Sequence, residues 1–412
     1  MINYKSQAYH RESLKVLEIL EDNGFKARLA GGCVRDRVMG QPAKDIDIAT
    51  DAKPDEVSLI FKQKNFRTVP TGIDHGTITI IGKFGAYEVT TLRRDVVTDG
   101  RHAKVVFGES FQEDALRRDF TMNAMFQDRE GQIYDYFLGR KHIEEGVLKF
   151  VGDAKKRIKE DYLRILRLYR FWARFNLKPD RQALEAIEEL GAGLRQISQE
   201  RITSELLGTF KAANPEDACR DMFRNQIMLH VLPDARKIDN KAFKETKAIK
   251  NDDSRAIARI SLLVQHIEDP DHVSAIGKKL RLSKKQIEKL NCLVILGGYL
   301  TQDLSLDQAE QMDLIDLCEK NGSGFLIECC LPTWRVFTGS NSNLLDQLHQ
   351  TELSKGHLRC SKLPVSANDL MQALKISAGR KLGKILDELK RLYRNEVFTE
   401  KSEALEIAKK LV

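Results

Sequence analysis

Apolar positions up to about residue 140 follow a mixed pattern. Short β-branched or apolar runs alternate there with apolar stripes of helical spacing. The run Thr77–Ile81 is the clearest strand, and Gly82–Gly85 is typical of the hairpin turn that follows it. We expect helices over 11–23 and 51–64, and strands over 25–30, 45–50, 77–81 and 86–92. This pattern predicts a small mixed α/β domain.

Beyond about residue 141, helical periodicity replaces the strand pattern, with few prolines or glycines. We expect helices over 153–175, 180–191, 198–212, 215–229, 254–267, 283–298, 306–319, 367–375 and 379–394. The predicted fold class is therefore α+β, with an N-terminal head that contains a small mixed sheet and helices, followed by an all-helical remainder. We divide the chain into a head (1–140), a helical neck (141–212), a helical body (213–300) and a helical tail (301–412).

The composition narrows the class of protein. With 412 residues and a net charge of +7, the chain is long enough for several domains and suits a polyanionic partner, although many basic proteins bind no nucleic acid. Its seven cysteines are scattered and form no zinc-type pair, which favours a reducing cytoplasm. The sequence contains neither an apolar signal segment nor an apolar run of about 18 residues. We therefore expect a cytoplasmic protein without a membrane partner, and nothing predicts its oligomeric state.

The first candidate site combines a glycine turn with two acidic residues. The backbone amides after Gly31 suit an anion, and we expect Gly32 and Arg35 to bind phosphate oxygens. Asp45 and Asp47 alternate along a strand, so their carboxylates point to one face. Glycine turns and acidic pairs are each common when taken singly. Together, they suit phosphoryl or nucleotidyl transfer that depends on Mg²⁺.

In this order and spacing, the two motifs resemble the signature of the nucleotidyltransferase superfamily. The form is that of class II tRNA nucleotidyltransferases (CCA-adding enzymes) and bacterial poly(A) polymerases. The resemblance implies a nucleotidyltransferase head in which the catalytic residues Asp45 and Asp47 bind two Mg²⁺ ions. One ion would activate the attacking 3′-hydroxyl and the other would steady the triphosphate. Glu88 is a candidate third carboxylate, with a solvent-facing strand glutamate as an equal alternative.

A second motif reads RRDFTMNA over residues 117–124 and resembles the family's RRDFTxNA block. The resemblance implies that Arg118 reaches the triphosphate. It also implies that Asp119 and Asn123 shape the sugar and phosphate side of the pocket. A charged helix start would explain only part of this string. The charged segment 93–103 is expected to be a loop, and such a loop is a mark of the family members that add both C and A.

A third motif reads EDYLRILRLYR over residues 160–170. On spacing alone, it is an amphipathic helix with ordinary ion pairs. It also resembles the family's EDxxR block, in which an Asp and an Arg hydrogen-bond the incoming base. That resemblance gives these roles to Asp161 and Arg164, with Arg167 and Arg170 extending the pocket. An accepting carboxylate and a donating guanidinium match the edges of cytosine and adenine, which both carry an amino group.

The resemblance covers residues 25–175 densely and the tail loosely. The motif sequences are most similar to those of the α-proteobacterial and mitochondrial branch. His142 stands where many members have an acid, and the His-Asp pair of an added phosphohydrolase domain is missing from the sequence. The block over 200–207 resembles a later block of the family that braces the helix of the third motif, and we interpret most of it as a capped structural helix. The basic helix over 379–394 is a candidate contact for an RNA backbone, with a solvated surface as the alternative.

The resemblance thus implies a template-independent tRNA nucleotidyltransferase. Such an enzyme adds CCA to tRNA 3′ ends from CTP and ATP by two-metal catalysis and releases pyrophosphate. Its partner would be tRNA and its cofactor Mg²⁺. One alternative is a poly(A) polymerase on the same head, and another is a partial enzyme that adds only A. A catalytically silent RNA-binding protein is a third, against which the intact Asp45 and Asp47 argue.

Overall fold

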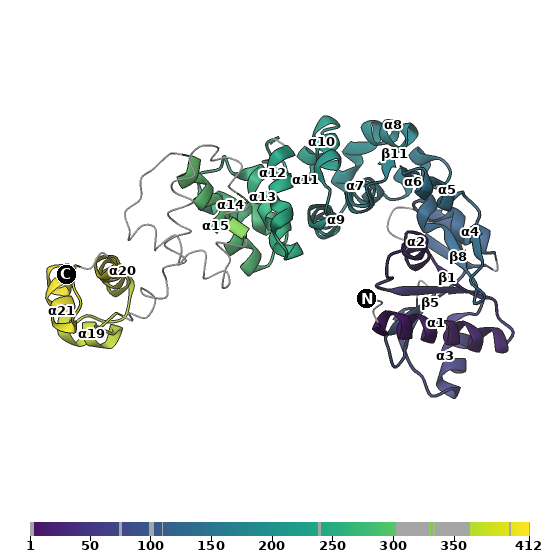
Figure 1. The fold of residues 1–412 in the computed structure, drawn as a ribbon, viewed down its shortest axis with the longest axis horizontal. Coiled ribbons are helices and arrows are strands. Elements are labelled where there is room, and N and C mark those ends of the chain that lie inside the picture. Colours follow the sequence, from purple (N-terminus) through teal and green to yellow (C-terminus); the bar gives the residue numbers. More distant parts are fainter. Residues whose placement is uncertain are drawn as a thin grey trace. The chain divides into compact units, whose positions relative to one another are not determined.

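The computed structural model describes residues 4–73, 76–98, 103–108, 110–237, 240–301, 329–330, 333, 363–394 and 397–411. The helix predicted over 306–319 and the segment 99–102 of the predicted loop lie outside these residues. The chain divides into two compact units, Met1–Thr209 with Asp217–Pro233, and Phe210–Glu216 with Asp234–Val412. Figure 1 shows the elements of both units.

A seven-stranded sheet with the strand order β3-β4-β5-β2-β1-β8-β9 forms the centre of the head. Its strands are β1 (Ala27–Ala30), β2 (Ile46–Thr50), β3 (Arg67–Gly72), β4 (Thr77–Ile81), β5 (Ala86–Thr91), β8 (Met125–Gln127) and β9 (Ile133–Asp135). Neighbouring strands are antiparallel except β2 and β5, which are parallel. The register places Asp47 between Ala30 and Glu88. The predicted mixed sheet is confirmed.

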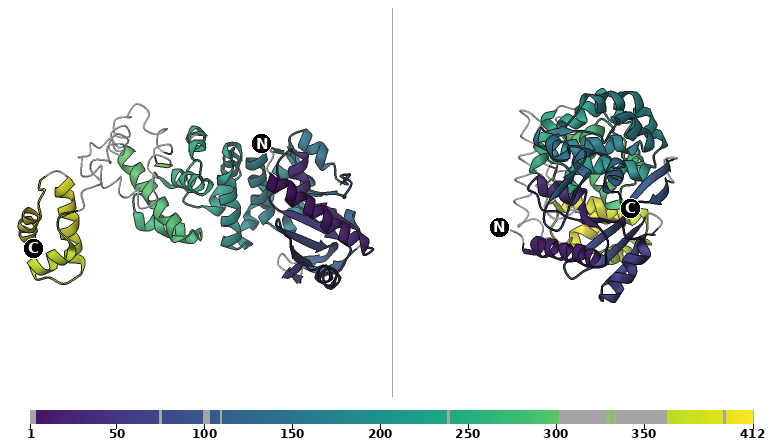
Figure 2. Two further views of the ribbon diagram at one scale, coloured as in Figure 1. Left: turned by 60° about the horizontal axis from the view of Figure 1, so that its bottom comes forward. Right: turned by 90° about the vertical axis from the view of Figure 1, so that its right-hand side faces the viewer.

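Two helices, α1 (Tyr4–Asp22) and α3 (Pro54–Gln63), cover one face of this sheet. Figure 2 shows α1, in dark purple, lying along the strands. Their apolar stripes form one core with Ile46, Ile48 and the other inward residues of the strands. Because side chains alternate along a strand, Asp47 faces the opposite side of the sheet from its two buried neighbours.

The opposite face of the sheet carries a smaller core. Ala30, Ala49 and Phe126 pack there with Leu92 and Phe111. Three short elements lie near these strands: α4 (Phe111–Leu116), which contributes Phe111 and Ala115 to this core, the 3₁₀ helix η2 (Thr121–Asn123), and α2 (Gly32–Val38), whose Cys33 and Val34 pack in the first core. They carry the glycine turn and the RRDFTMNA string.

A two-stranded antiparallel hairpin follows β5. It consists of β6 (Arg93–Thr98) and β7 (Ala103–Phe107), so the prediction of a loop over 93–103 was wrong for residues 93–98 and for Ala103. Valine pairs at 96–97 and 105–106 favour extended strands, which outweighs the charge of the flanking residues.

The neck begins with two helices in place of the single helix predicted over 153–175. They are α6 (Ala154–Glu160) and α7 (Leu163–Phe175). Asp161 between them has an extended backbone, with φ −157° and ψ 104°, and its carboxylate accepts a hydrogen bond from the Leu163 N–H at 3.1 Å. A short acidic side chain that accepts from an amide two residues further on favours the start of a helix, which explains the break.

The rest of the first unit beyond the sheet, on both sides of α6 and α7 in the chain, is mainly helical. Its helices are α5 (Gly139–Glu144), α8 (Arg181–Leu190), η3 (Gly191–Gln196), α9 (Gln199–Lys211), α10 (Glu216–Arg224) and α11 (Ile227–Val231), with a short parallel pair of β10 (Val147–Leu148) and β11 (Lys178–Pro179). The helix predicted over 215–229 is also broken, at Gln226, where φ is 59°.

The second unit is helical in its described residues. Its helices are α12 (Asn240–Glu245), η4 (Thr246–Ala248), α13 (Asp252–Val264), α14 (Pro270–Lys279) and α15 (Lys284–Thr301), then α19 (Ala367–Leu374), α20 (Arg380–Arg394) and α21 (Lys401–Lys410). Arg259 is fully buried in α13 and donates to the carbonyls of Phe210 and Ala212 at 2.6 Å. The last three helices share a small core of their own. Across the described chain, no helix is long and apolar enough to cross a membrane.

Candidate active site

An arginine-lined cavity of about 490 Å³ opens beside β2. Seven of the nine predicted site residues line it: Gly32, Arg35, Asp47, Arg118, Asp161, Arg164 and Arg167. Asp45 and Arg170 are not among the lining residues. The lining contains six arginines against three aspartates, so its formal charge is positive and suits a polyphosphate.

Asp47 is the β2 carboxylate that reaches this cavity. Glu88 is its register neighbour on β5, and Asp45 lies on an exposed bend just before β2. Burial and the charge of Glu88 raise the pKa of Asp47 from 3.8 to about 6, with a smaller contribution from Asp45. Asp47 is therefore close enough to Glu88 and to Asp45 for their charges to repel its own.

This repulsion is what a divalent cation would relieve, so the acidic residues fit a metal of that charge. In the described part of the chain, no three His, Cys, Asp or Glu side chains are arranged around one metal position. Mg²⁺ is commonly held by one or two carboxylates together with substrate phosphates, and this donor set matches Asp45 and Asp47 beside an anion-binding cavity.

The turn at Gly31 brings the backbone close to Arg118. Gly31 has a φ of 69°, and a Cβ at this position would lie 2.5 Å from Arg118 Nη1. Its N–H donates to the carbonyl of Met125 at 3.0 Å. The left-handed backbone requires glycine here, and a larger residue would also have to displace the end of the Arg118 side chain.

Arg35 is buried and anchored within the protein. Its Nε and Nη2 donate to Asp36 Oδ1 at 2.8 and 2.6 Å, and its Nη1 donates to Asn123 Oδ1 at 2.6 Å. The guanidinium also lies 4.6 Å from the centre of the Phe175 ring. Burial lowers the pKa of Arg35, and Asp36 opposes this effect. The structure therefore shows Arg35 lining the cavity with its hydrogen-bond donors directed to protein acceptors.

Asp114 holds the two arginines of the RRDFTMNA string. Arg117 donates to its Oδ1 at 2.8 and 2.6 Å, and Arg118 donates to its Oδ2 at 3.2 and 3.0 Å. Burial alone would raise the pKa of Asp114, but the two guanidinium groups outweigh it and lower the pKa. Arg118 also donates to the carbonyl of Asn123 at 3.1 Å. The position of Arg118 is thus set by α4 and η2 together.

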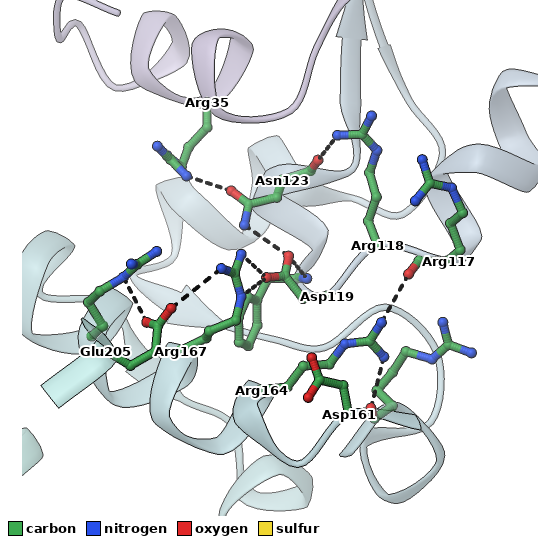
Figure 3. A network of polar contacts seen from close by, with 12 residues as sticks. Arg35, Arg117, Arg118, Asp119, Asn123, Asp161, Arg164, Arg167 and Glu205 are labelled. Atoms are coloured by element: carbon green, nitrogen blue, oxygen red, sulfur yellow. Dashed lines mark hydrogen bonds and ion pairs between the residues drawn. The ribbon is translucent and has the colours of Figure 1, made fainter. Parts of the chain in front are cut away.

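Asp119 connects the head to the neck. It accepts two hydrogen bonds from Arg167 on α7, at 2.8 and 2.6 Å, and one from Asn123 Nδ2 at 3.0 Å. Figure 3 shows Asn123 between Arg35 and Asp119. A continuous set of hydrogen bonds therefore runs from the glycine turn to α7.

Asp161 and Arg164 lie at the start of α7 and have different partners. Arg164 Nη1 donates to Glu160 Oε2 and to the Arg157 carbonyl, both at 2.8 Å. Asp161 Oδ2 accepts from Arg201 Nη2 at 2.7 Å. An acceptor and a donor group thus line one end of the cavity.

Arg170 lies behind Arg167 on α7. Its Nε is 3.1 Å from Glu205 Oε2 on α9, and Arg167 Nη1 is 3.7 Å from Glu205 Oε1. Burial raises the pKa of Glu205, with the two arginines opposing the rise. Glu205 therefore braces the arginine face of α7, which agrees with the structural interpretation of the 200–207 block.

Four residues line the cavity that we did not predict as site residues: Arg117, Leu163, Phe171 and Arg201. Arg117 stands next to Arg118 in a motif that we had identified, so the sequence could have identified it as a site residue. Arg201 falls in the block that we interpreted as structural. Leu163 and Phe171 have only the apolar periodicity of a helix, which does not distinguish a cavity wall from a core.

The comparison with protein families gives the class. Residues 27–149 match the family described as the poly A polymerase head domain. Residues 176–238 match the family described as a probable RNA and SrmB-binding site of polymerase A. With Asp47 on β2 beside an arginine-lined cavity, this fold and site define a nucleotidyltransferase.

Relatives that align over most of this chain identify the family to which it belongs. The mitochondrial CCA tRNA nucleotidyltransferase 1 of Mus musculus is 34% identical and aligns over 98% of this chain and 91% of its own length. The CCA-adding enzyme of Staphylococcus aureus (strain Mu3) is 33% identical over 71% of this chain and 70% of its own. The chain belongs to the family of CCA-adding tRNA nucleotidyltransferases.

A solved structure shows the same fold. The crystal structure of the Bacillus stearothermophilus CCA-adding enzyme in complex with CTP has a TM-score of 0.75 and 24% identity to this chain. The match covers 97% of this chain and 96% of that chain. The predicted α+β class, a nucleotidyltransferase head followed by helices, is therefore confirmed.

Proposed function

We propose that this protein adds C, C and A in turn to the 3′ end of tRNA, from CTP and ATP and without a nucleic-acid template. Each addition releases pyrophosphate. The observation that carries the proposal is that one cavity is lined by Asp47 and also by Asp161 and Arg164. Membership in the family, and a similar fold solved in complex with CTP, support it.

Asp161 and Arg164 are proposed to select the base. A carboxylate can accept a hydrogen bond from the amino group of cytosine or adenine, and a guanidinium can donate to the adjacent ring nitrogen. Uracil and guanine present a carbonyl where these two bases carry the amino group. Arg167, and Arg170 behind it, extend the pocket with positive charge.

Asp45 and Asp47 are proposed to be the catalytic carboxylates that hold Mg²⁺. When bound, such ions lower the pKa of the attacking 3′-hydroxyl and stabilise the charge on the triphosphate. Burial and the charge of Glu88 raise the pKa of Asp47, and this supports the role because a bound cation would favour the charged carboxylate.

Gly32 and Arg118 are proposed to bind the triphosphate. The Gly31 turn opens backbone amides to the cavity, and Arg118 faces that turn. Arg35 is proposed to contribute positive charge to the phosphate site while its bonds to Asp36 and Asn123 hold the turn in place.

The division into head, neck, body and tail stays a proposal, as does a cytoplasmic location. The tail is proposed to bind the tRNA backbone through the basic residues of α20. Exposed Lys381 and Lys390 support this assignment, because phosphate contacts are made largely by lysine and arginine.

A nucleotide-addition assay tests the proposal. The protein is incubated with tRNA transcripts that end before CCA, after C or after CC, with labelled CTP or ATP. We expect two additions of C followed by one of A. Long tails of A on every transcript would instead indicate a poly(A) polymerase, and addition of A to the CC transcript alone would indicate a partial enzyme.

A double variant tests the proposed role of the two catalytic carboxylates. Asp45→Ala with Asp47→Ala is expected to abolish transfer and leave tRNA binding unchanged in a filter-binding assay. Transfer retained by this variant would place the metal site elsewhere in the protein.

A further inference from the structure

We propose that Tyr9 is a positioning residue for the metal site, whose hydroxyl holds the peptide between Asp45 and Ile46 in place. The Asp45 carboxylate is thereby kept at a fixed distance from that of Asp47. The inference rests on the proposed role of these two carboxylates in binding Mg²⁺. It gives a function to α1, a helix from which none of the described lining residues of the cavity comes.

Asp45 lies where the strand pairing ends. Asp47 is held on both sides, opposite Ala30 on β1 and Glu88 on β5. The register of β2 begins at Ile46, so Asp45 lies outside it, on an exposed bend. Backbone outside a sheet moves more freely than backbone within it. The place of Asp45 therefore depends on what holds the peptide that follows it.

Tyr9 supplies that contact. Its hydroxyl accepts from the Ile46 N–H at 3.2 Å and donates to the Ala86 carbonyl at 2.7 Å. The Ile46 nitrogen belongs to the peptide bond with Asp45, and Ala86 is the first residue of β5. One hydroxyl thus joins the starts of the two parallel strands, directly beside the acidic pair.

The ring of Tyr9 is itself fixed by its neighbours. Its centre lies 4.9 Å from that of the Tyr87 ring, and Tyr87 Oη donates to the Tyr9 carbonyl at 3.0 Å. A Cβ at Gly85 would lie 2.3 Å from Tyr9 Cε2, so the absence of a side chain there makes room for the ring. Tyr9 also packs against the core beneath α1. The hydroxyl therefore reaches the strands from the side opposite the cavity, and it acts on the backbone without touching a substrate.

The electrostatics of Tyr9 agree with this placement. Burial raises the pKa of its hydroxyl, and the hydrogen bond from Ile46 opposes the rise. The charges of Asp45 and Asp47 also raise this pKa, so both carboxylates lie near the phenol. The oxygen keeps its proton near neutral pH, which the bond to the Ala86 carbonyl requires.

The test measures metal binding directly. Mn²⁺ is added to the protein alone and the free ion is followed by electron paramagnetic resonance, with the Asp45→Ala, Asp47→Ala double variant as the background. Tyr9→Phe keeps the ring and removes the hydroxyl. We expect it to raise the half-saturating Mn²⁺ concentration about fivefold, the effect of losing one hydrogen bond between neutral groups.

The kinetics of CTP addition give a second readout. The half-saturating Mg²⁺ concentration should rise in Tyr9→Phe by a similar factor. The KM for CTP at saturating Mg²⁺ should stay within about twofold, because Tyr9 is not among the residues that line the cavity. A role in folding alone would lower the melting temperature and leave both metal titrations unchanged.

Tyr134→Phe is the matched control. Tyr134 lies on β9 of the same sheet, and its hydroxyl also makes one hydrogen bond, to Asp128 Oδ2 at 3.1 Å. Neither residue belongs to the proposed metal site. We expect this variant to bind Mn²⁺ as the unchanged protein does, and melting temperatures check that each variant is folded.

Asp45→Asn separates this inference from the proposed function. If Asp45→Asn weakens Mn²⁺ binding, adding Tyr9→Phe should weaken it no further, because the carboxylate to be positioned is gone. Normal Mn²⁺ binding by folded Tyr9→Phe, while Asp45→Asn weakens it, would overturn the inference alone. Unchanged binding in Asp45→Asn would instead overturn the proposed metal role of Asp45, and with it the basis for the role of Tyr9.

Discussion

Asp114 holds two arginines of the RRDFTMNA string although its carboxylate is buried. Only 2% of this side chain is exposed, against 19% and 21% for Arg117 and Arg118. The change Asp114→Asn keeps the shape of the side chain and removes its charge. An amide has one oxygen in place of two, and its NH₂ group faces guanidinium donors. We expect both arginines to lose their fixed positions.

The magnitude follows from the burial of the pair. Removing one partner of a buried ion pair costs about 3–5 kcal/mol because the remaining charge has no counterion. The arginines keep some access to water, so we expect the lower end, about 3 kcal/mol. Glu185→Gln removes the partner of Arg181 on the surface, and we expect a loss below about 1 kcal/mol there.

The contribution of Asp114 to the free energy of unfolding depends on pH in a defined direction. Arg118 and Arg117 lower the pKa of Asp114 in the folded protein despite its burial. A lowered carboxyl pKa contributes stability that is complete above the unfolded value of about 3.8 and is lost as the pH falls through the folded value. The difference between Asp114→Asn and the unchanged protein should therefore be constant from pH 6 to pH 8.

Urea unfolding followed by the fluorescence of Trp172 provides the assay. Trp172 lies in the first unit, and a Trp334→Phe background makes it the only tryptophan. We expect the midpoint to fall by about 1 M urea. We also expect kcat/KM for CTP to fall at least tenfold, since Arg118 no longer faces the turn. A midpoint within error of that of Glu185→Gln would refute this account of the arginine pair.

Three further predictions concern the same cavity. The raised pKa of Asp47, about 6, means that a proton competes with the metal at lower pH, so the apparent Mg²⁺ affinity should fall by about tenfold for each pH unit below 6, measured by magnesium titration of transfer activity. Asp161→Ala should impair the choice among nucleotides more than total addition, and unchanged rejection of UTP and GTP would contradict its role. Gly31→Ala places a Cβ 2.5 Å from Arg118 Nη1 at a φ of 69°, so it should raise the KM for CTP and ATP and lower stability by about 1 kcal/mol or more, checked by kinetics and urea unfolding.

Local patterns were enough to predict the sheet and the acidic strand. Ile46 and Ile48 alternate with Asp47, so strand geometry alone predicted which face is core, and both isoleucines are buried. The break at Asp161 was missed because the periodicity of α6 and α7 continues across it. The backbone of Asp161 is extended and its carboxylate accepts from the Leu163 N–H at the start of the second helix, which a count of apolar positions does not detect.

The sequence by itself determined the positions of the acidic pair and the glycine turn, and it predicted the residues of the proposed base-selecting motif. These depend on spacing within one strand, one turn or one helix start. Only the tertiary structure decided the distant partners of two cavity arginines: Asp119 for Arg167 and Asp161 for Arg201. These partners lie 48 and 40 positions apart in the chain. Because a charged side chain is directed by whichever counterion the fold brings within reach, its role in the cavity follows from packing between elements.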